Sequence, residues 1–223
     1  MEVLFFGRYK EKLSKKIFLL LKKNFKKVDV IWSYSYNERI NRKLKKSYHY
    51  IFAFRSYLIL KKNIINKAKI AAINFHPATP NYRGVGCANY AIFENSKYFG
   101  STAHIINDKI DNGKILDMIK FKISNKISLE NLLKKTHRKQ YLLAKKTITN
   151  IVKKKDYLNI QINKNKNIKW SNTLGTKKKL DKFYELKNIN LSKEQFHRYL
   201  RSTLYKNYKP VIKIKGKYFK YDN

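Results

Sequence analysis

Short apolar segments alternate with helix-like segments through the first third of the chain. Continuous apolar runs, each about as long as a buried strand, lie at 2–7, 28–33, 49–54 and 70–74. The intervening segments predict helices near 10–25 and 58–68 and a polar, basic helix or loop at 37–46. Strands that alternate with helices are typical of βαβ units. The sequence therefore predicts an α/β fold with a Rossmann-like, mostly parallel sheet.

The remaining chain predicts more elements of this kind and a small tail. A helix at 87–95 is followed by expected strands at 101–107 and 114–124, and by a long helix at 129–155 that Ser128 can cap. A polar stretch at 153–170 marks a boundary. We therefore expect a catalytic domain over 1–155 and a small C-terminal subdomain over 170–223. In that subdomain, a helix candidate at 192–204 and two alternating runs at 210–221 predict a helix plus a hairpin.

The charge of the chain is extreme, with 52 Lys+Arg against 14 Asp+Glu and a formal net charge of +38. Such a balance points to nucleic acid or an anionic membrane surface. The excess is almost all lysine, however, and it is spread along the whole chain rather than gathered in one stripe. Together with the many Asn, Ile and Tyr residues, this pattern indicates compositional drift. We therefore expect no dedicated nucleic-acid partner, although the charge attracts any substrate that carries phosphate.

Other global features predict a cytoplasmic protein. A single cysteine, Cys87, excludes an internal disulfide, which fits a reducing compartment. The N-terminal apolar run is too short for a signal peptide. The apolar run at 17–21 is far below the ~20 residues that span a bilayer. We expect no membrane partner.

The segment after the fourth strand gathers polar residues suited to chemistry. Ligands of open α/β sheets bind beyond the carboxyl ends of the strands, where Asn74 and His76 lie. Their spacing of two places both side chains on one face of an extended chain. Asp111 lies in the loop before the last predicted strand of the sheet, and its carboxylate can face the histidine from there. None of these residues is specific alone, since a histidine after a strand is more often structural.

Several other site types are not supported by the sequence. It lacks the GxGxxG dinucleotide fingerprint, the GxSxG nucleophile elbow and the Walker lysine motif. We also expect no metal site, because one cysteine cannot build a zinc centre. The remaining histidines show no ligand spacing, namely His49, His104, His137 and His197. His104 is expected to be a structural residue inside a strand.

The order and spacing of the motifs are more specific than any single residue. The segment "NFHPATPNYRGVGCANYAIFENSKYFGSTAHIINDKIDNGKIL" (74–116) resembles the core of the folate-dependent formyltransferases. The family pattern is Asn-x-His-Pro, a loop with Pro and Gly, a short helix, a glycine before a strand with Thr and His, and Asp-x-Gly. The matching residues are Asn74, His76, Pro77, Gly84, Gly100, Thr102, His104, Asp111 and Gly113.

Within this superfamily, the chain looks most like the sugar N-formyltransferases. Ala-Thr-Pro follows the histidine here, where the other branches typically carry Ser-Leu-Leu-Pro. The resemblance implies 10-formyltetrahydrofolate as donor and the primary amine of a nucleotide-linked amino sugar as acceptor. It leaves open which sugar and which nucleotide (dTDP, UDP or GDP) are used, and a homodimer is possible.

The resemblance also implies roles for residues of the site. Asn74 and His76 would donate hydrogen bonds to the oxyanion that develops on the formyl group. Asp111 would raise the pKa of His76 and accept the proton of the attacking amine, directly or through water. The folate would lie against two segments, represented by Phe54, Arg55, Tyr57, Leu58, Ile59, Asn107 and Asp108. Candidates for the sugar nucleotide and its phosphates are Arg83, Gly84, Lys177, Lys178, Arg198 and Arg201.

Two alternatives remain open at the level of sequence. The first is an enzyme like methionyl-tRNA formyltransferase that acts on another amine. Such enzymes continue into a larger C-terminal barrel, for which we expect the tail of this chain to be too short. The second is a basic RNA-binding protein without enzymatic activity. That function does not need Asn-x-His together with a distant Asp-x-Gly, so we expect an enzyme.

Overall fold

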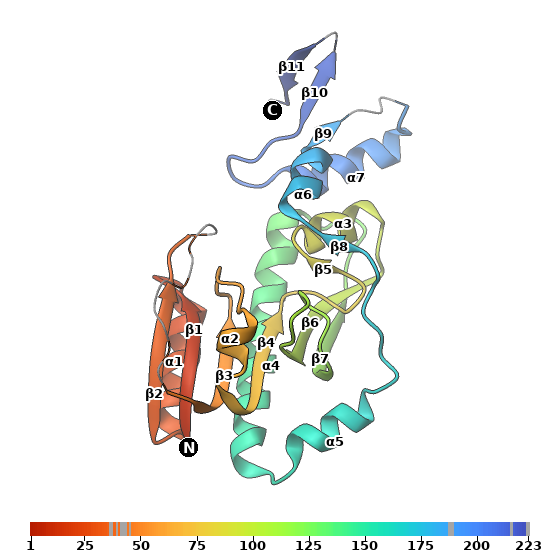
Figure 1. Ribbon diagram of the computed structural model, residues 1–223. Helices are drawn as coiled ribbons and strands as arrows, with labels where there is room; N and C mark the ends of the chain where they lie inside the picture. Colours follow the sequence, from red (N-terminus) through yellow and green to blue (C-terminus); the bar gives the residue numbers. More distant parts are fainter. Residues whose placement is uncertain are drawn as a thin grey trace.

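A six-stranded sheet forms the centre of the molecule (Figure 1). The computed structural model describes residues 1–35, 38, 40, 44, 46–186, 190–214 and 216–221. The strand order is β2-β1-β3-β4-β6-β7. The bounds are Glu2–Arg8 (β1), Lys27–Ser33 (β2), Tyr48–Phe54 (β3), Ala68–His76 (β4), Tyr98–Ile105 (β6) and Ile115–Lys122 (β7). Strands β1 to β4 are parallel, and β6 and β7 join antiparallel. The predicted α/β fold with a mostly parallel sheet is confirmed.

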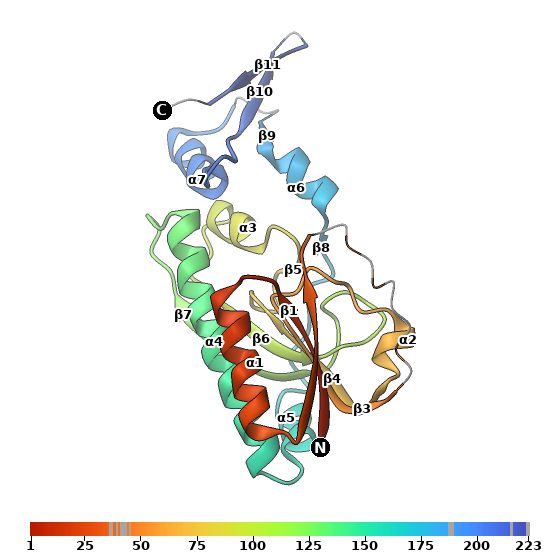
Figure 2. The same cartoon turned by 90° about the vertical axis from the view of Figure 1, so that its left-hand side faces the viewer.

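Helices cover both faces of this sheet because its central strands bury apolar side chains on both sides. Phe5 points into the larger core, which is closed by α1 (Lys12–Asn24) and α4 (Leu129–Lys153). These two helices run side by side on one face (Figure 2). Leu4 and Phe6 point into the smaller core on the other face, where α2 (Lys62–Ile65) packs. Strands buried on both faces read as continuous apolar runs, which is why the sequence revealed them.

The helix predicted over 58–68 is wrong for most of its length. Only α2 forms there, and the chain before it is irregular. Leu58 and Leu60 are buried while Ile59 between them is 68% exposed. That alternation belongs to an extended chain rather than to a helix. The helix or loop predicted at 37–46 lies mostly outside the described residues.

The tail contains the predicted helix and hairpin together with elements that the sequence did not reveal. The predicted parts are α7 (Lys193–Thr203), β10 (Val211–Ile214) and β11 (Lys217–Lys220). The additional parts are α5 (Tyr157–Lys164), β8 (Leu174–Gly175), α6 (Lys177–Tyr184) and β9 (Glu185–Leu186). Helix α5 lies in the stretch we interpreted as a polar boundary, and it packs against β7. The division at 155 and 170 therefore stays a prediction.

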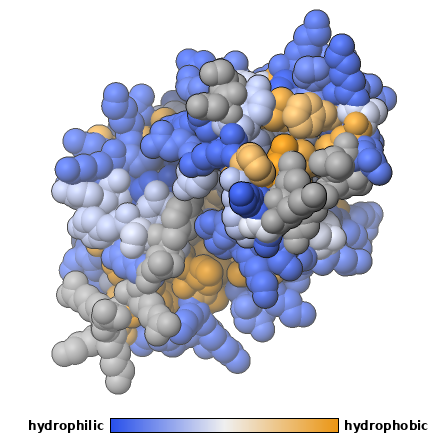
Figure 3. All heavy atoms as spheres, turned by 90° about the horizontal axis from the view of Figure 1, so that it is seen from above, coloured by the Kyte–Doolittle hydropathy of each residue, from blue (hydrophilic) through white to orange (hydrophobic). Residues whose placement is uncertain are grey.

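The tail contacts α3 (Cys87–Phe93) of the preceding part of the chain. Helix α7 packs on α3, and Asn89 Nδ2 donates to Ser202 O at 2.7 Å. In the view toward the tail, hydrophilic residues cover most of the surface, with a few hydrophobic patches (Figure 3). Within the described ranges, no helix has the length and apolar character needed to span a membrane.

Candidate active site

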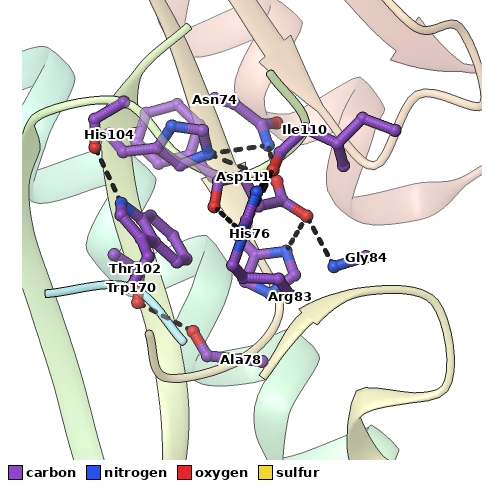
Figure 4. Close-up of polar contacts among 12 residues, drawn as sticks. Asn74, His76, Ala78, Arg83, Gly84, Thr102, His104, Ile110, Asp111 and Trp170 are labelled. Atoms are coloured by element: carbon purple, nitrogen blue, oxygen red, sulfur yellow. Dashed lines mark hydrogen bonds and ion pairs between the residues drawn. The ribbon is translucent and has the colours of Figure 1, made fainter. Parts of the chain in front are cut away.

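Asn74 and His76 lie at the C-terminal end of β4, and their side chains are on the sheet face opposite the larger core. His76 is the last residue of the strand rather than the first residue beyond it. The antiparallel pairing of β4 with β6 places His104 opposite Asn74 and Thr102 opposite His76. Paired residues share a face of a sheet. The imidazole of His104 therefore lies beside Asn74. The side chains of Asn74, His76 and His104 form one group (Figure 4).

Asp111 enters this group from the loop before β7. Its Oδ2 lies 3.1 Å from Nδ1 of His76 and accepts a hydrogen bond from the backbone N–H of Gly84 at 3.0 Å. Its Oδ1 lies 3.4 Å from Nε2 of His104 and 3.4 Å from Nδ2 of Asn74. The structure thus brings Asn74, His76 and Asp111 together, as predicted. It also brings in His104, which we expected only to be structural.

His76 is held as a cation by its surroundings. Its Nε2 lies 2.7 Å from the carbonyl of Tyr82, and its Nδ1 faces the Asp111 carboxylate. Both partners are acceptors, so both ring nitrogens carry a proton. Burial opposes the charge, but Asp111 outweighs burial and raises the pKa of His76 well above 6.5. In this arrangement the ring has no N–H left for a substrate unless Tyr82 gives up its hydrogen bond.

The Asp111 carboxylate is ionised for the complementary reason. Its burial favours the neutral acid, but the charge of His76 and the hydrogen bonds from both histidines lower the pKa of Asp111 well below 3.8. Its φ of 42° lies in the left-handed region. The centre is therefore an ion pair enclosed by protein, with side-chain exposures of 3% and 11%.

Two neighbours of the imidazoles were missed as site residues. The thiol of Cys87 lies 3.7 Å from Nε2 of His76 and donates to Gly84 O at 3.3 Å. The indole of Trp170 packs against His76 and His104, with its plane at 68° and 79° to the two imidazoles. Trp170 follows a lysine-rich stretch that carries no motif, so nothing in the local sequence marks it. Cys87 begins α3 directly after the predicted loop, and its position there was the only available signal.

Arg83 joins the loops around the ion pair. Its Nε donates to Asp111 O at 2.8 Å, its Nη2 to Ile110 O at 2.8 Å, and its Nη1 to Ser171 O at 3.0 Å. Each guanidinium nitrogen is thus already engaged with a backbone carbonyl. Gly84 follows with φ +78°, and a Cβ there would lie 2.1 Å from Gly175 O. The predicted phosphate role of Arg83 stays a prediction, and its observed contacts are structural.

The segment predicted to bind folate has a fixed backbone. Ser14 Oγ donates to Phe54 O at 3.3 Å, and Arg8 Nε donates to Arg55 O at 3.0 Å. The N–H of Tyr57 donates to a serine hydroxyl, Ser33 Oγ, at 2.9 Å. Phe54 and Leu58 are buried, whereas Ile59 is exposed. In the second predicted segment, Asn107 Oδ1 accepts from Lys109 N and Asp108 is exposed.

The predicted cations of the tail make contacts elsewhere. Lys177 pairs with Asp181, and Lys178 is exposed on the same helix. Arg198 pairs with Glu194 at 2.7 Å, and Arg201 donates to Asn125 O at 2.7 Å. None of these contacts is with the group around Asp111. Among the described residues, no cluster of three or more His, Cys, Asp or Glu side chains is placed to hold a metal ion.

Comparisons with known proteins identify a family for the chain. A family model described as "Formyl transferase" matches residues 8–148. The methionyl-tRNA formyltransferase of Finegoldia magna is 28% identical over 95 residues, which are 42% of this chain and 29% of that protein. The chain thus spans less than a third of that relative's length.

Solved structures match over nearly the whole chain. A sugar N-formyltransferase from a Shewanella species aligns with a TM-score of 0.71 and 19% identity, covering 99% of this chain and 96% of that one. The N-formyltransferase from Helicobacter canadensis, solved with folinic acid and dTDP-3-aminofucose, aligns with a TM-score of 0.71 and 20% identity, covering 97% and 85%. At these identities the likeness shows a shared fold.

Proposed function

The chain belongs to the formyl transferase family, and from that premise we propose that it transfers a formyl group from 10-formyltetrahydrofolate to the primary amine of a nucleotide-linked amino sugar. The observation that carries the proposal is the buried ion pair of His76 and Asp111 beside the amide of Asn74. Formyl transfer to an amine requires donors for a developing oxyanion and an acceptor for a proton. This group of side chains contains both.

His76 and Asn74 serve the oxygen of the formyl group. As the amine nitrogen bonds to the formyl carbon, negative charge grows on that oxygen. A buried imidazolium stabilises this charge strongly because little water screens it. Direct donation from Nε2 requires the ring to exchange its present partner, the Tyr82 carbonyl. Asn74 likewise has to turn an N–H from Asp111 or His104 toward the substrate.

Asp111 serves the proton of the amine. The carboxylate is ionised and can accept the proton directly or through a water. The bond between the formyl carbon and the folate nitrogen then breaks, and that nitrogen takes up a proton. His76 keeps Asp111 ionised until the amine arrives. The pair therefore links the two tasks, because neutralising either partner changes the pKa of the other.

The predicted folate segment suits a flat, hydrogen-bonding donor. Its backbone is held at Phe54, Arg55 and Tyr57 by side chains from three other elements. A segment fixed in this way presents its remaining backbone groups at constant positions. Ile59 adds an exposed apolar side chain. These features support Phe54 to Ile59 as the pteridine-facing segment, with Asn107 and Asp108 in the facing loop.

The acceptor is the least constrained part of the proposal. The aligned Helicobacter canadensis enzyme was solved with dTDP-3-aminofucose, which supports an amino-sugar nucleotide here. The curated Finegoldia magna relative instead acts in the tRNA branch, which keeps an aminoacyl-tRNA as the second candidate. Arg83, Lys177, Lys178, Arg198 and Arg201 remain proposed contacts for the phosphates.

The test is a formyl-transfer assay with 10-formyltetrahydrofolate and a panel of acceptors. Amino-sugar nucleotides with dTDP, UDP and GDP form one arm, and methionyl-tRNA forms the other. We expect tetrahydrofolate and a formylated amino sugar in the first arm, with loss of turnover in His76→Asn. Turnover only with methionyl-tRNA would replace the sugar by the second candidate. No turnover in either arm would overturn the proposed function.

A further inference from the structure

Trp170 lies beyond the residues matched by the formyl transferase model, yet its indole contacts the centre of the site. The indole and His104 ring centroids are 5.0 Å apart, with the planes at 79°. The indole and His76 centroids are 5.8 Å apart, with the planes at 68°. Edge-to-face geometry at these distances is favourable for aromatic rings. One side chain from the distant part of the chain therefore packs against both imidazoles (Figure 4).

The indole is anchored to the loop that carries Asp111. Its Nε1–H donates to Gly113 O at 2.8 Å. A Cβ at Gly113 would lie 1.7 Å from Ile105 O, so this loop runs directly against β6. Backbone that approaches this closely requires glycine. The position of Trp170 is thus fixed relative to the strand of His104 and to the loop of Asp111.

The residues after Trp170 are held along the loop that follows His76. Ser171 N donates to Pro80 O at 2.9 Å, and Ser171 O accepts from Arg83 Nη1 at 3.0 Å. Farther along, Val85 N donates to Gly175 O at 3.0 Å. These bonds fix the backbone beside the indole. The segment 170–175 is therefore part of the wall of the site, although it lies far from His76 in the sequence.

We propose that Trp170 is a positioning residue, whose indole holds the rings of His76 and His104 in the orientation in which they face Asp111. The torsion that turns an imidazole has broad minima, so contacts decide where the ring points. The inference rests on the proposed formyl transfer, where a misplacement of about 1 Å can cost roughly 10²-fold in rate.

A matched variant separates positioning from simple stabilisation of the fold. The other tryptophan, Trp32, packs edge-on to Phe5 and Phe18, with ring centroids 6.0 and 5.6 Å away. It contacts the larger core and not the imidazoles. Trp32→Leu therefore removes an indole from the fold without touching the site. Trp170→Leu removes one that contacts the site.

The experiment compares kcat, KM and melting temperature in the full-length variants. We expect Trp170→Leu to lower kcat by about 10- to 100-fold, with both KM values within about threefold. Trp32→Leu should keep kcat within about threefold even where it melts at a lower temperature. Trp170→Phe retains an aromatic ring and should recover most of the rate. Equal losses in the two Leu variants, or a Phe variant as slow as Trp170→Leu, would overturn the proposal.

A second measurement does not depend on turnover or on the acceptor. The imidazole signals of His76 and His104, followed by NMR against pH, should change position and titration in Trp170→Leu. They should match the wild type in Trp32→Leu. Unchanged imidazole signals in Trp170→Leu would refute the positioning role of Trp170, whatever the formyl-transfer activity of that variant. If the wild type transfers no formyl group, the proposed function fails, while these signals still decide the role of Trp170. Should Trp170→Leu not fold, Trp170→Phe is compared by the same signals, and a titration like that of the wild type is the expected result.

Discussion

The Asp111 carboxylate lies 3.1 Å from Nδ1 of His76, and Nε2 of the same ring lies 2.7 Å from a carbonyl oxygen. A histidine between two acceptors has to carry both ring protons. The site is therefore set up as an imidazolium–carboxylate pair before any substrate binds. Breaking a buried pair leaves one charge without a partner, which costs more than the pair contributes on its own. This asymmetry makes single substitutions in the pair informative.

Replacing Asp111 by Asn should remove the proton acceptor and most of the support for charged His76. We expect kcat to fall by about 10²–10³-fold, because both the oxyanion and the amine proton lose a partner. Circular dichroism should show a folded protein, since Asn keeps the shape of the side chain. Glu130→Gln, which removes an exposed carboxylate paired with Lys134, is the control and should leave kcat unchanged. A fully active Asp111→Asn enzyme would rule out the proposed role.

The stabilisation by the pair should depend on pH in a defined window. The pKa of His76 lies well above 6.5 in the fold, so its contribution is complete below pH 6.5 and is lost as pH rises through the raised pKa. The pKa of Asp111 lies well below 3.8, so its contribution is present above pH 3.8 and is lost as pH falls through the lowered pKa. Between these limits His76→Gln should lower the free energy of unfolding by about 3–5 kcal/mol.

Urea unfolding at a series of pH values measures this difference between wild type and His76→Gln. The difference should be flat from pH 3.8 to 6.5 and should shrink at alkaline pH. The exposed pair of Glu130 and Lys134 provides the control, because Glu130→Gln should change little in the same window. A difference that grows as pH rises would contradict the ion pair.

The parts of the site that sequence predicted are those governed by local rules. A spacing of two along an extended chain places Asn74 and His76 on one face whatever the rest of the fold does. The apolar runs of β1 to β4 mark buried or half-buried strands, so the parallel half of the sheet was predictable. The Asp-x-Gly loop was recognised by its resemblance to the family rather than by any periodicity.

The parts that sequence did not predict depend on register and on distant packing. His104 reaches the site because β6 pairs antiparallel with β4 and places it opposite Asn74, and no local pattern encodes that register. Trp170 reaches the site because α5 returns the chain along β7. Helix α6 was not predicted, because four of its eight residues are lysine and none of its residues is buried.

His104 should contribute to catalysis through Asp111 and Asn74. Its Nδ1 lies 2.9 Å from Ile105 O, and its Nε2 lies 3.4 Å from Asp111 Oδ1 and 3.2 Å from Asn74 Nδ2. We expect His104→Gln to lower kcat by about tenfold, less than His76→Asn, since it removes one of several contacts that orient the carboxylate. His197→Gln, on an exposed face of α7, is the control. If His104→Gln abolishes turnover while His76→Asn keeps most of it, the assignment of His76 is wrong.

His137 on α4 should make the fold less stable in mild acid. Burial, with the nearby Arg55 and Arg8 charges, lowers the pKa of His137 to about 3. The unfolded chain therefore binds this proton below pH 6.5 while the folded chain does not, so stability is lost as pH falls from 6.5 toward 3. We expect a loss of about 1–3 kcal/mol in the free energy of unfolding across that range. The slope should be absent in His137→Gln and unchanged in His197→Gln, and a slope that persists in His137→Gln would assign it to another group.

Gly84 should tolerate no side chain, for two separable reasons. Its φ of +78° is unfavourable for alanine, and a Cβ would lie 2.1 Å from Gly175 O. Gly216 has a similar φ of +80° but nothing within 4 Å of the corresponding Cβ, so it isolates the conformational cost. We expect Gly216→Ala to cost about 1 kcal/mol of unfolding free energy and Gly84→Ala about 2–4 kcal/mol.

The Gly84 variant should also slow catalysis, because its backbone N–H holds Asp111 Oδ2 at 3.0 Å. Moving that N–H away from the carboxylate removes a donor that keeps Asp111 ionised and aimed at His76. Urea midpoints and kcat measured on both alanine variants check the two effects together. Gly216→Ala should leave kcat within about twofold of the wild type, whereas Gly84→Ala should lower it by about tenfold or more. If the two variants are equally destabilised, the Gly175 carbonyl moves aside at little cost. If Gly84→Ala also keeps full activity, the backbone N–H of Gly84 does not position the Asp111 carboxylate.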